Sequence, residues 1–272
     1  MDLSNLISSW PFDPDTPSAR IVRAADGSQK LQLRVDLGVL QMELKGRPDG
    51  TQPDGFPSVL HYYHDLEKNG NLPSALTDDE CAVIHREAMQ YFSRLNGFVA
   101  LEWDRQTYDD AEHILDLLDL VSDLAASDET AWRVNQIYPF VRLHHARSAA
   151  RLAANAARYS RARAILERAI DDIREYYANG ADEDEPAIPG DDDPDAAPPE
   201  IRTLHDLLAS LDTDQPLSEE ENLQKALQSA LEHENYEKAA RLRDTLRRLR
   251  DSRPTRSPSP PAKRPAPPPG DP

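Results

Sequence analysis

The chain contains one cysteine, few aromatic residues and no long hydrophobic run. The lone Cys81 excludes an internal disulfide and a cysteine-rich zinc site, which is typical of proteins in a reducing cytoplasm. No apolar stretch reaches the roughly 18 residues of a membrane-spanning helix, and the first residues lack the basic start of a secretory signal. We therefore expect a soluble, cytoplasmic protein with no membrane contact.

Positive charge is also outnumbered. The chain has 31 lysines and arginines and 49 aspartates and glutamates, which gives a formal net charge of −18. Nucleic-acid-binding proteins normally present clustered positive charge, so a general affinity for DNA is not expected. The basic segment from Arg241 to Arg264 is the one place where nucleic acid could bind. A solvated helix face with charge-balancing arginines is the preferred interpretation of that segment.

Familiar catalytic and ligand-binding motifs are missing. The glycine-bearing segment 46–55 lacks the Lys-Ser/Thr of a phosphate-binding loop and is expected to be a surface connection. His61 and His64 have a spacing that could hold zinc, but histidines on a helix surface are the simpler interpretation. Cys81 has no obvious base beside it. We expect no catalytic residues, no metal and no cofactor; the alternative is an enzyme or ligand-binding protein with its site in residues 1–70.

The N-terminal region, residues 1–70, is expected to form an arm and a small α/β region. Apolar and polar residues alternate at 20–25 and 30–36 on either side of an Asp-Gly turn signal, and a third alternating run spans 39–44. These patterns predict a small antiparallel meander. A helix is expected after Pro57, and Trp10 in the arm is expected to dock onto the body.

Residues 71–178 are expected to form a helical body, which makes the fold class mainly α with a small N-terminal antiparallel β meander (α+β). Thr77 and Glu80 form a capping-box signature that opens a helix. Its expected core residues are Val83, Ile84, Met89, Phe92 and Leu95. Further helices are expected to begin near Tyr108, to span 132–157 without a break, and to begin at Tyr159.

Two similar segments lie 51 residues apart in this body: Tyr108-x-x-Ala111 and Tyr159-x-x-Ala162. The second resembles a tetratricopeptide-like helical hairpin, together with Ala150, Leu166 and Ala169. Such a resemblance implies stacked helix pairs with a concave face for peptides or helices. An ordinary four-helix body without a groove is the alternative.

Composition changes sharply after the helical body. Residues 179–200 form an acidic Pro/Gly linker with almost no large apolar residue, so this segment cannot build a core. A short amphipathic helix and connection are expected at 201–216. Residues 252–272 are rich in proline and basic residues and are expected to be a disordered tail.

Residues 217–251 have the pattern of two short amphipathic helices. Pro216 and Ser218 precede three glutamates, which favours a helix start. Leucines and alanines then recur every three or four residues on one side. A second helix is expected from Tyr236 to about Arg250, with Pro254 ending it.

The segment Asn235-Tyr-Glu-Lys-Ala-Ala-Arg-Leu-Arg-Asp244 closely resembles the UVR domain, the UvrB/UvrC motif of bacterial excision-repair proteins. That family also includes some regulators of protein kinases and of chaperone-linked proteases. The resemblance implies an antiparallel helical hairpin that binds another such hairpin. It covers about an eighth of the chain.

A hairpin of this size is too small to fold alone, because few apolar side chains are available to offset the conformational entropy lost. We therefore expect a bacterial adaptor whose hairpin is covered by a UVR-like hairpin on a partner or by a second copy, with this chain's own helical body as the alternative. DNA excision repair and a stress-protease system are both open. The expected contact residues are Leu223, Leu227, Leu231, Tyr236, Ala239, Ala240, Leu242 and Leu246, with Arg241 and Arg243 at the rim.

Overall fold

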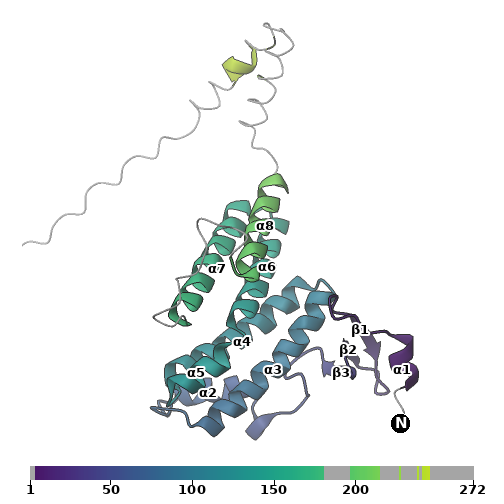
Figure 1. The fold of residues 1–272 in the computed structure, drawn as a ribbon, viewed down its shortest axis with the longest axis vertical. Coiled ribbons are helices and arrows are strands. Elements are labelled where there is room, and N and C mark those ends of the chain that lie inside the picture. The colour runs from purple at the N-terminus through teal and green to yellow at the C-terminus, as the bar shows by residue number, and fades with distance from the viewer. Residues whose placement is uncertain (1–3, 181–196, 215–226, 228–237, 239–240, 246–272) are drawn as a thin grey trace, which may run out of the picture. The chain divides into compact units, whose positions relative to one another are not determined.

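The computed structural model describes residues 4–180, 197–214, 227, 238 and 241–245. The chain divides into two compact units, residues 1–214 and residues 215–272. Within the described residues of the first unit, helices predominate and the strands form a small N-terminal sheet (Figure 1). The expected fold class, mainly α with an antiparallel meander, is confirmed.

The sheet has three antiparallel strands in the order β1-β2-β3, namely β1 (Ala19–Arg23), β2 (Gln29–Val35) and β3 (Gly38–Glu43). Ile21, Leu31 and Met42 lie opposite one another across the three strands. The turn between β1 and β2 contains Gly27 at φ 85°, a conformation that glycine adopts without steric cost. The Asp-Gly signal therefore correctly predicted the hairpin.

The N-terminal arm begins with a short helix, α1 (Ser4–Ser9), and Trp10 then docks onto the sheet. The Trp10 indole donates a hydrogen bond to Ser18 Oγ at 2.7 Å. The guanidinium of Arg20 lies 4.2 Å from the Trp10 ring centroid, and Arg34 donates from Nε to the Trp10 carbonyl at 2.6 Å. The expected docking of Trp10 is confirmed, with the sheet as its surface.

A short 3₁₀ helix and seven α-helices follow the sheet in the described residues of the first unit. They are η1 (Pro53–Gly55), α2 (Val59–Lys68), α3 (Asp78–Ala100), α4 (Asp104–Leu124), α5 (Asp128–Asn135), α6 (Tyr138–Asn155), α7 (Tyr159–Gly180) and α8 (Pro199–Asp214). The capping box at α3 is present, since Thr77 and Glu80 exchange hydrogen bonds at 2.8 and 3.3 Å.

Three sequence-based expectations for the helices were wrong. Val83 is 46% exposed, because the buried stripe of α3 passes through Cys81 and Ile84 on the other side of the helix. The segment 132–157 is not one helix: Pro139 lacks an N–H group and stands in the first turn of α6, after α5 has ended. The helix expected near Tyr108 begins at Asp104 instead.

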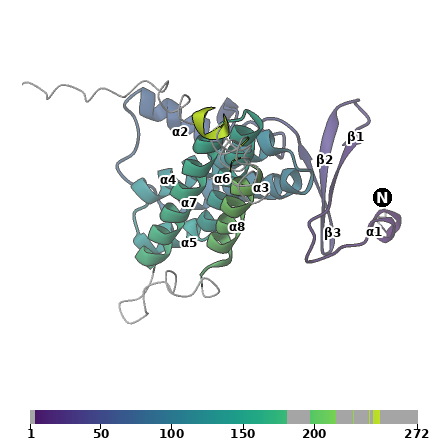
Figure 2. The same cartoon turned by 90° about the horizontal axis from the view of Figure 1, so that it is seen from above.

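The sheet packs on the C-terminal part of α3, to one side of the helices (Figure 2). Leu31, Leu33 and Met42 from the sheet form a small core with Phe98 of α3. Arg94 strengthens this joint, because its Nη1 donates to the carbonyls of Glu43 and Gly46 at 2.9 and 2.7 Å. The meander is thus fixed to the helical body by both apolar and polar contacts.

The helices pack in succession, α3 on α4, α4 on α6, α6 on α7, and α8 on both α6 and α7. Ala111 and Ala162, the small residues of the two similar segments, are both fully buried. Ile201 and Leu204 of α8 are buried in the same core as Leu166. The helix expected at 201–216 therefore belongs to the body. Most of the expected linker, namely 181–196, and the tail at 252–272 lie outside the described residues.

Candidate functional site

The described part of the expected hairpin is helical at Leu227, at Lys238 and over 241–245. Leu227 and Leu242 are half-buried, whereas Arg241, Arg243 and the following two residues are exposed. Thr245 donates from its hydroxyl to the Arg241 carbonyl at 3.0 Å, a bond within the helix. The two leucines are thus less exposed than the charged residues beside Leu242.

The remaining expected contact residues lie outside the described residues. They are Leu223, Leu231, Tyr236, Ala239, Ala240 and Leu246. The contact stripe as a whole therefore stays a prediction. Among the described positions, Leu227 and Leu242 are half-buried, and Arg241 and Arg243 are exposed.

Among the described residues, the Glu87 side chain on α3 is a fully buried charged group. It accepts hydrogen bonds from the backbone N–H groups of Val59 and Leu60, at 2.8 and 3.3 Å, at the start of α2. His113 Nε2 lies 3.1 Å away and Arg47 Nε lies 3.3 Å away. Burial alone would raise the pKa of Glu87, but the bonds from His113 and Val59 hold it below its usual value.

This arrangement around Glu87 explains a structural role. Both carboxylate oxygens have partners, and the acid sits at the positive end of the α2 dipole. The cluster joins the 46–55 loop region, α2, α3 and α4, with each contact made between protein groups. A carboxylate held in this way joins these elements and is not free to accept a proton.

A second buried ion pair joins Arg94 of α3 to Asp110 of α4. The two guanidinium nitrogens Nε and Nη2 donate to the two carboxylate oxygens at 2.8 and 2.7 Å. Burial raises the pKa of Asp110 against the opposing effect of Arg94. Because Arg94 also bonds to the sheet, its contacts hold α3, α4 and the sheet together. Neither buried pair lies in one of the three cavities described for this unit.

The histidines that attracted attention in the sequence have protein partners or buried positions. His61 Nδ1 lies 2.7 Å from Ser58 Oγ, and the pKa of His61 is lowered by burial and by the neighbouring histidines. His144 and His145 both have a pKa of about 4, lowered first by burial and then by a nearby arginine. Within the described residues, no three His, Cys, Asp or Glu side chains group in a way that would hold a metal ion.

Cys81 is fully buried near the start of α3. Burial raises the pKa of its thiol, and the carboxylates of Asp78 and Glu80 raise it further. The side chain is therefore a protonated thiol at neutral pH. This environment agrees with the interpretation of Cys81 as an unreactive core residue.

The comparison with protein families decides the identity of the C-terminal segment. Residues 221–252 match the family model described as UvrB/uvrC motif, UVR. The chain carries a UvrB/uvrC motif. The matched range contains every contact residue predicted from the sequence, from Leu223 to Leu246. The resemblance of the Asn235–Asp244 segment to this family is therefore confirmed.

The UvrB/uvrC motif covers a small part of the chain, and the first unit lies wholly outside it. Comparisons with curated proteins and with solved structures give no match. The tetratricopeptide-like resemblance of the body therefore stays a prediction. Across the described residues, every helix is too short or too polar to cross a bilayer.

Proposed function

We propose that this protein is a non-catalytic bacterial adaptor that binds a partner protein through its UvrB/uvrC motif. The observation that carries the proposal is the family match at 221–252, whose members use the motif for association between proteins. The half-buried Leu242, between the exposed Arg241 and Arg243, supports it. The partner surface is a second UVR-like hairpin, either on another protein or on a second copy of this chain.

The absence of a suitable reaction centre in the described residues is consistent with an adaptor but is not the basis for it. The basis is the amphipathic motif itself, since a two-helix segment must bury its apolar side against another surface. Hot-spot reasoning places most of the binding energy on Tyr236 and the central leucines. The arginines Arg241 and Arg243 act at the rim, where they favour acidic partners and influence the rate of association.

The identity of the partner determines the cellular process in which this protein acts. The name of the motif connects it with excision repair, and the proposal extends to two settings, DNA excision repair and control of a stress protease. Loss of ultraviolet tolerance after deletion of the gene favours the first setting. Unchanged ultraviolet tolerance together with altered survival of heat stress favours the second.

A matched pair of substitutions tests the adaptor proposal. Leu242→Lys places a charge on the half-buried side, whereas Asp244→Lys places the same residue at an exposed position on the opposite side of the same helix. The probe is the isolated C-terminal motif of a UvrB protein, measured by isothermal titration calorimetry, and self-association is measured by sedimentation equilibrium. We expect Leu242→Lys to weaken one of these associations by about tenfold or more and Asp244→Lys to leave both unchanged.

Two results would count against the proposal. One is equal behaviour of the two variants, which would mean that the half-buried side makes no contact with a partner. The other is the absence of both associations in the native chain at concentrations up to about 100 μM, a range that covers weak specific complexes.

A further inference from the structure

Two cavities lie along the same three helices of the body, α4, α6 and α7. One has a volume of about 720 Å³ and also reaches α5. The other has a volume of about 420 Å³ and lies nearer the start of α7. Arg142 lines the smaller cavity, Asp172 lines the larger one, and these two side chains form an ion pair at 2.8 Å. The cavities are therefore neighbouring sections of one surface, which we call the α6 groove.

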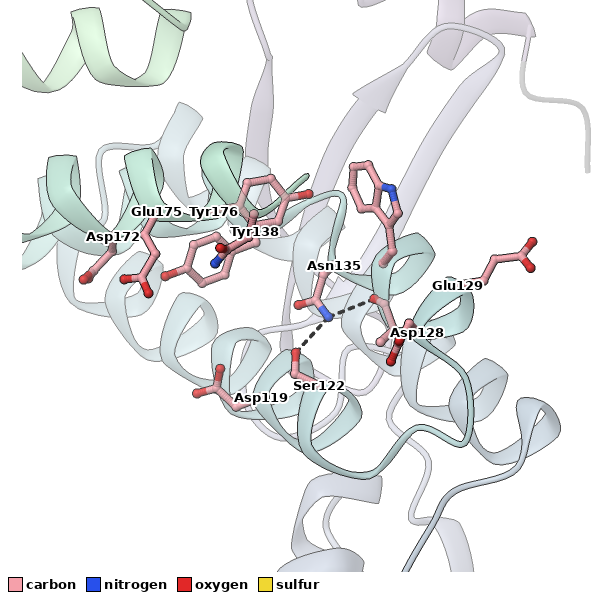
Figure 3. A pocket seen from close by; sticks show the side chains of 12 residues that line it. Asp119, Ser122, Asp128, Glu129, Asn135, Tyr138, Asp172, Glu175 and Tyr176 are labelled. Carbon is pink, nitrogen blue, oxygen red and sulfur yellow. Dashed lines mark hydrogen bonds between the residues drawn. The ribbon is translucent and has the colours of Figure 1, made fainter. Parts of the chain in front are cut away.

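The larger section of the α6 groove is acidic and aromatic. Figure 3 shows carboxylates from α4, α5 and α7 around Tyr138. The lining carboxylates are Asp119, Asp128, Glu129, Asp172 and Glu175. Tyr138 stacks on Tyr176 with ring centroids 5.3 Å apart, and Trp132 is 49% exposed beside them. Of the five acids, Asp172 alone forms an ion pair with another described residue.

Acids beside aromatic rings form a surface that attracts cations. A lysine or arginine side chain gains from the negative charge and from the faces of the aromatic rings together. Burial raises the pKa of Tyr138, and Asp172 raises it further, so the phenol stays neutral. The exposed Trp132 adds an aromatic side chain of the kind that is enriched in interfaces between proteins.

The smaller section has the opposite charge. Its basic lining residues are Arg105, Arg142, Arg158, Arg161 and Arg168. Its apolar lining residues are Ala149, Leu152, Ala153 and Ile165. Tyr108 and His145 stack there with centroids 4.5 Å apart. Because burial and Arg142 lower the pKa of His145 to about 4, the histidine is neutral and the positive charge comes from the arginines.

The residues that line the groove recur at helical spacing. Along α7 they run from Arg161 to Asn179, which corresponds to roughly 27 Å at about 1.5 Å rise per residue. The apolar lining of the smaller section, the aromatic rings of the larger section, the charged residues of both and this length suit an amphipathic helix of about 20 residues. A short extended peptide would need fewer than half as many residues to cross the same distance.

We propose that the α6 groove binds an amphipathic helical segment of a partner protein, with the segment's basic residues over the acidic section and its acidic residues over the basic section. The binding site is separate from the UvrB/uvrC motif and lies wholly within the first unit. The axis of the bound segment runs along α6. The small alanine side chains of the basic section allow the segment to approach α6 closely. The opposite charges of the two sections fix the direction in which the segment lies.

The test uses the full chain and a synthetic fluorescent peptide of about 20 residues, with leucines along one helical side, arginines in one half and glutamates in the other. A control peptide has the same composition and the same leucine positions, but its arginines and glutamates alternate along the sequence. We expect the first peptide to bind about tenfold or more tightly than the control, and its affinity to fall as salt is added. Peptide binding also shifts tryptophan emission, and Trp132→Phe removes the shift.

Charge-reversing substitutions locate the binding site. Glu175→Arg changes the acidic section and Arg161→Glu the basic section, and both residues are exposed. The matched controls are Asp171→Arg on α7 and Arg86→Glu on α3, which are exposed and line neither section. We expect each groove variant to weaken peptide binding by about tenfold and each control to leave it unchanged. Circular dichroism melts confirm that all four variants are folded.

Several results would overturn the proposal. Equal affinity for the two peptides would mean that the separation of charge has no role, and equal effects of groove and control variants would place the peptide elsewhere. Duplex DNA whose binding depends on Arg161 but not on Glu175 would assign the basic section to nucleic acid. Self-association of the native chain that is lost in both groove variants would assign the groove to a second copy.

Discussion

A Cβ atom on Gly97 of α3 would lie 2.5 Å from Leu31 Cδ2 of β2. Real Cβ atoms do not approach other carbons so closely, so the glycine lets the helix and the sheet meet. Leu31 is fully buried. The missing side chain at Gly97 thus contributes to the close packing of the meander on the helical body.

Replacing Gly97 with valine is expected to destabilise the fold by about 1–3 kcal/mol, the usual cost of overpacking a core. The matched control is Gly38→Val in β3, where an added Cβ meets nothing within 4 Å and a branched side chain suits a strand. Urea denaturation of the two variants measures the difference. Equal stability of both variants would contradict the close approach of α3 and β2.

Glu87→Gln is expected to destabilise the fold by about 3 kcal/mol, because it removes one charge from a buried ion-pair cluster. The amide also places an N–H donor opposite donors from Val59 and His113. Glu67→Gln, on the exposed side of α2, is the control and is expected to stay within about 0.5 kcal/mol of the native chain. Urea denaturation of both variants at neutral pH provides the comparison.

Stability is expected to fall on acidification below about pH 6.5, the ordinary pKa of histidine. His144 is buried and its pKa is about 4 in the folded chain, so the unfolded chain binds a proton there first. Its contribution is complete above pH 6.5 and is lost as the pH falls toward 4. Urea midpoints between pH 7.5 and 4.5 measure the slope; His144→Gln should flatten it, and His64→Gln, at an exposed position, should not.

Cys81 is expected to resist thiol reagents in the folded chain, since its side chain is fully buried and its thiol pKa is raised. Labelling with a disulfide reagent should be slow at neutral pH and should become fast in urea. Rapid labelling of the native chain, with no loss of helical circular dichroism, would show an accessible and reactive thiol instead.

Local signals predicted the elements that depend on local physics. The Asp-Gly turn gave the hairpin of the sheet, and the reciprocal bonding of Thr77 and Glu80 gave the start of α3. The break before Pro139 was missed because a proline in the first turn of a helix looks the same in sequence as one inside a longer helix, and alanine-rich sequence follows it. Val83 was assigned to the core because it is apolar and precedes Ile84 in the chain, although the helix turns its side chain away from the buried residues.

The clusters that depend on packing had no signal in the sequence. Glu87 meets groups from Arg47, Val59 and His113, which are far apart along the chain and carry no common motif. The α6 groove joins side chains from α4, α5, α6 and α7, and its separation of charge appears only when the helices are stacked. The UvrB/uvrC motif was different, because its recognition residues lie together in one short segment.

The UvrB/uvrC motif is expected to fold stably only against another apolar surface. Circular dichroism and sedimentation equilibrium of the excised segment 217–251, across a series of concentrations, test this expectation most directly. We predict little helix in the dilute monomer, and helix that grows with concentration or on addition of a UvrB motif. A dilute monomer that is fully helical, melts cooperatively and binds neither itself nor that motif would contradict the account.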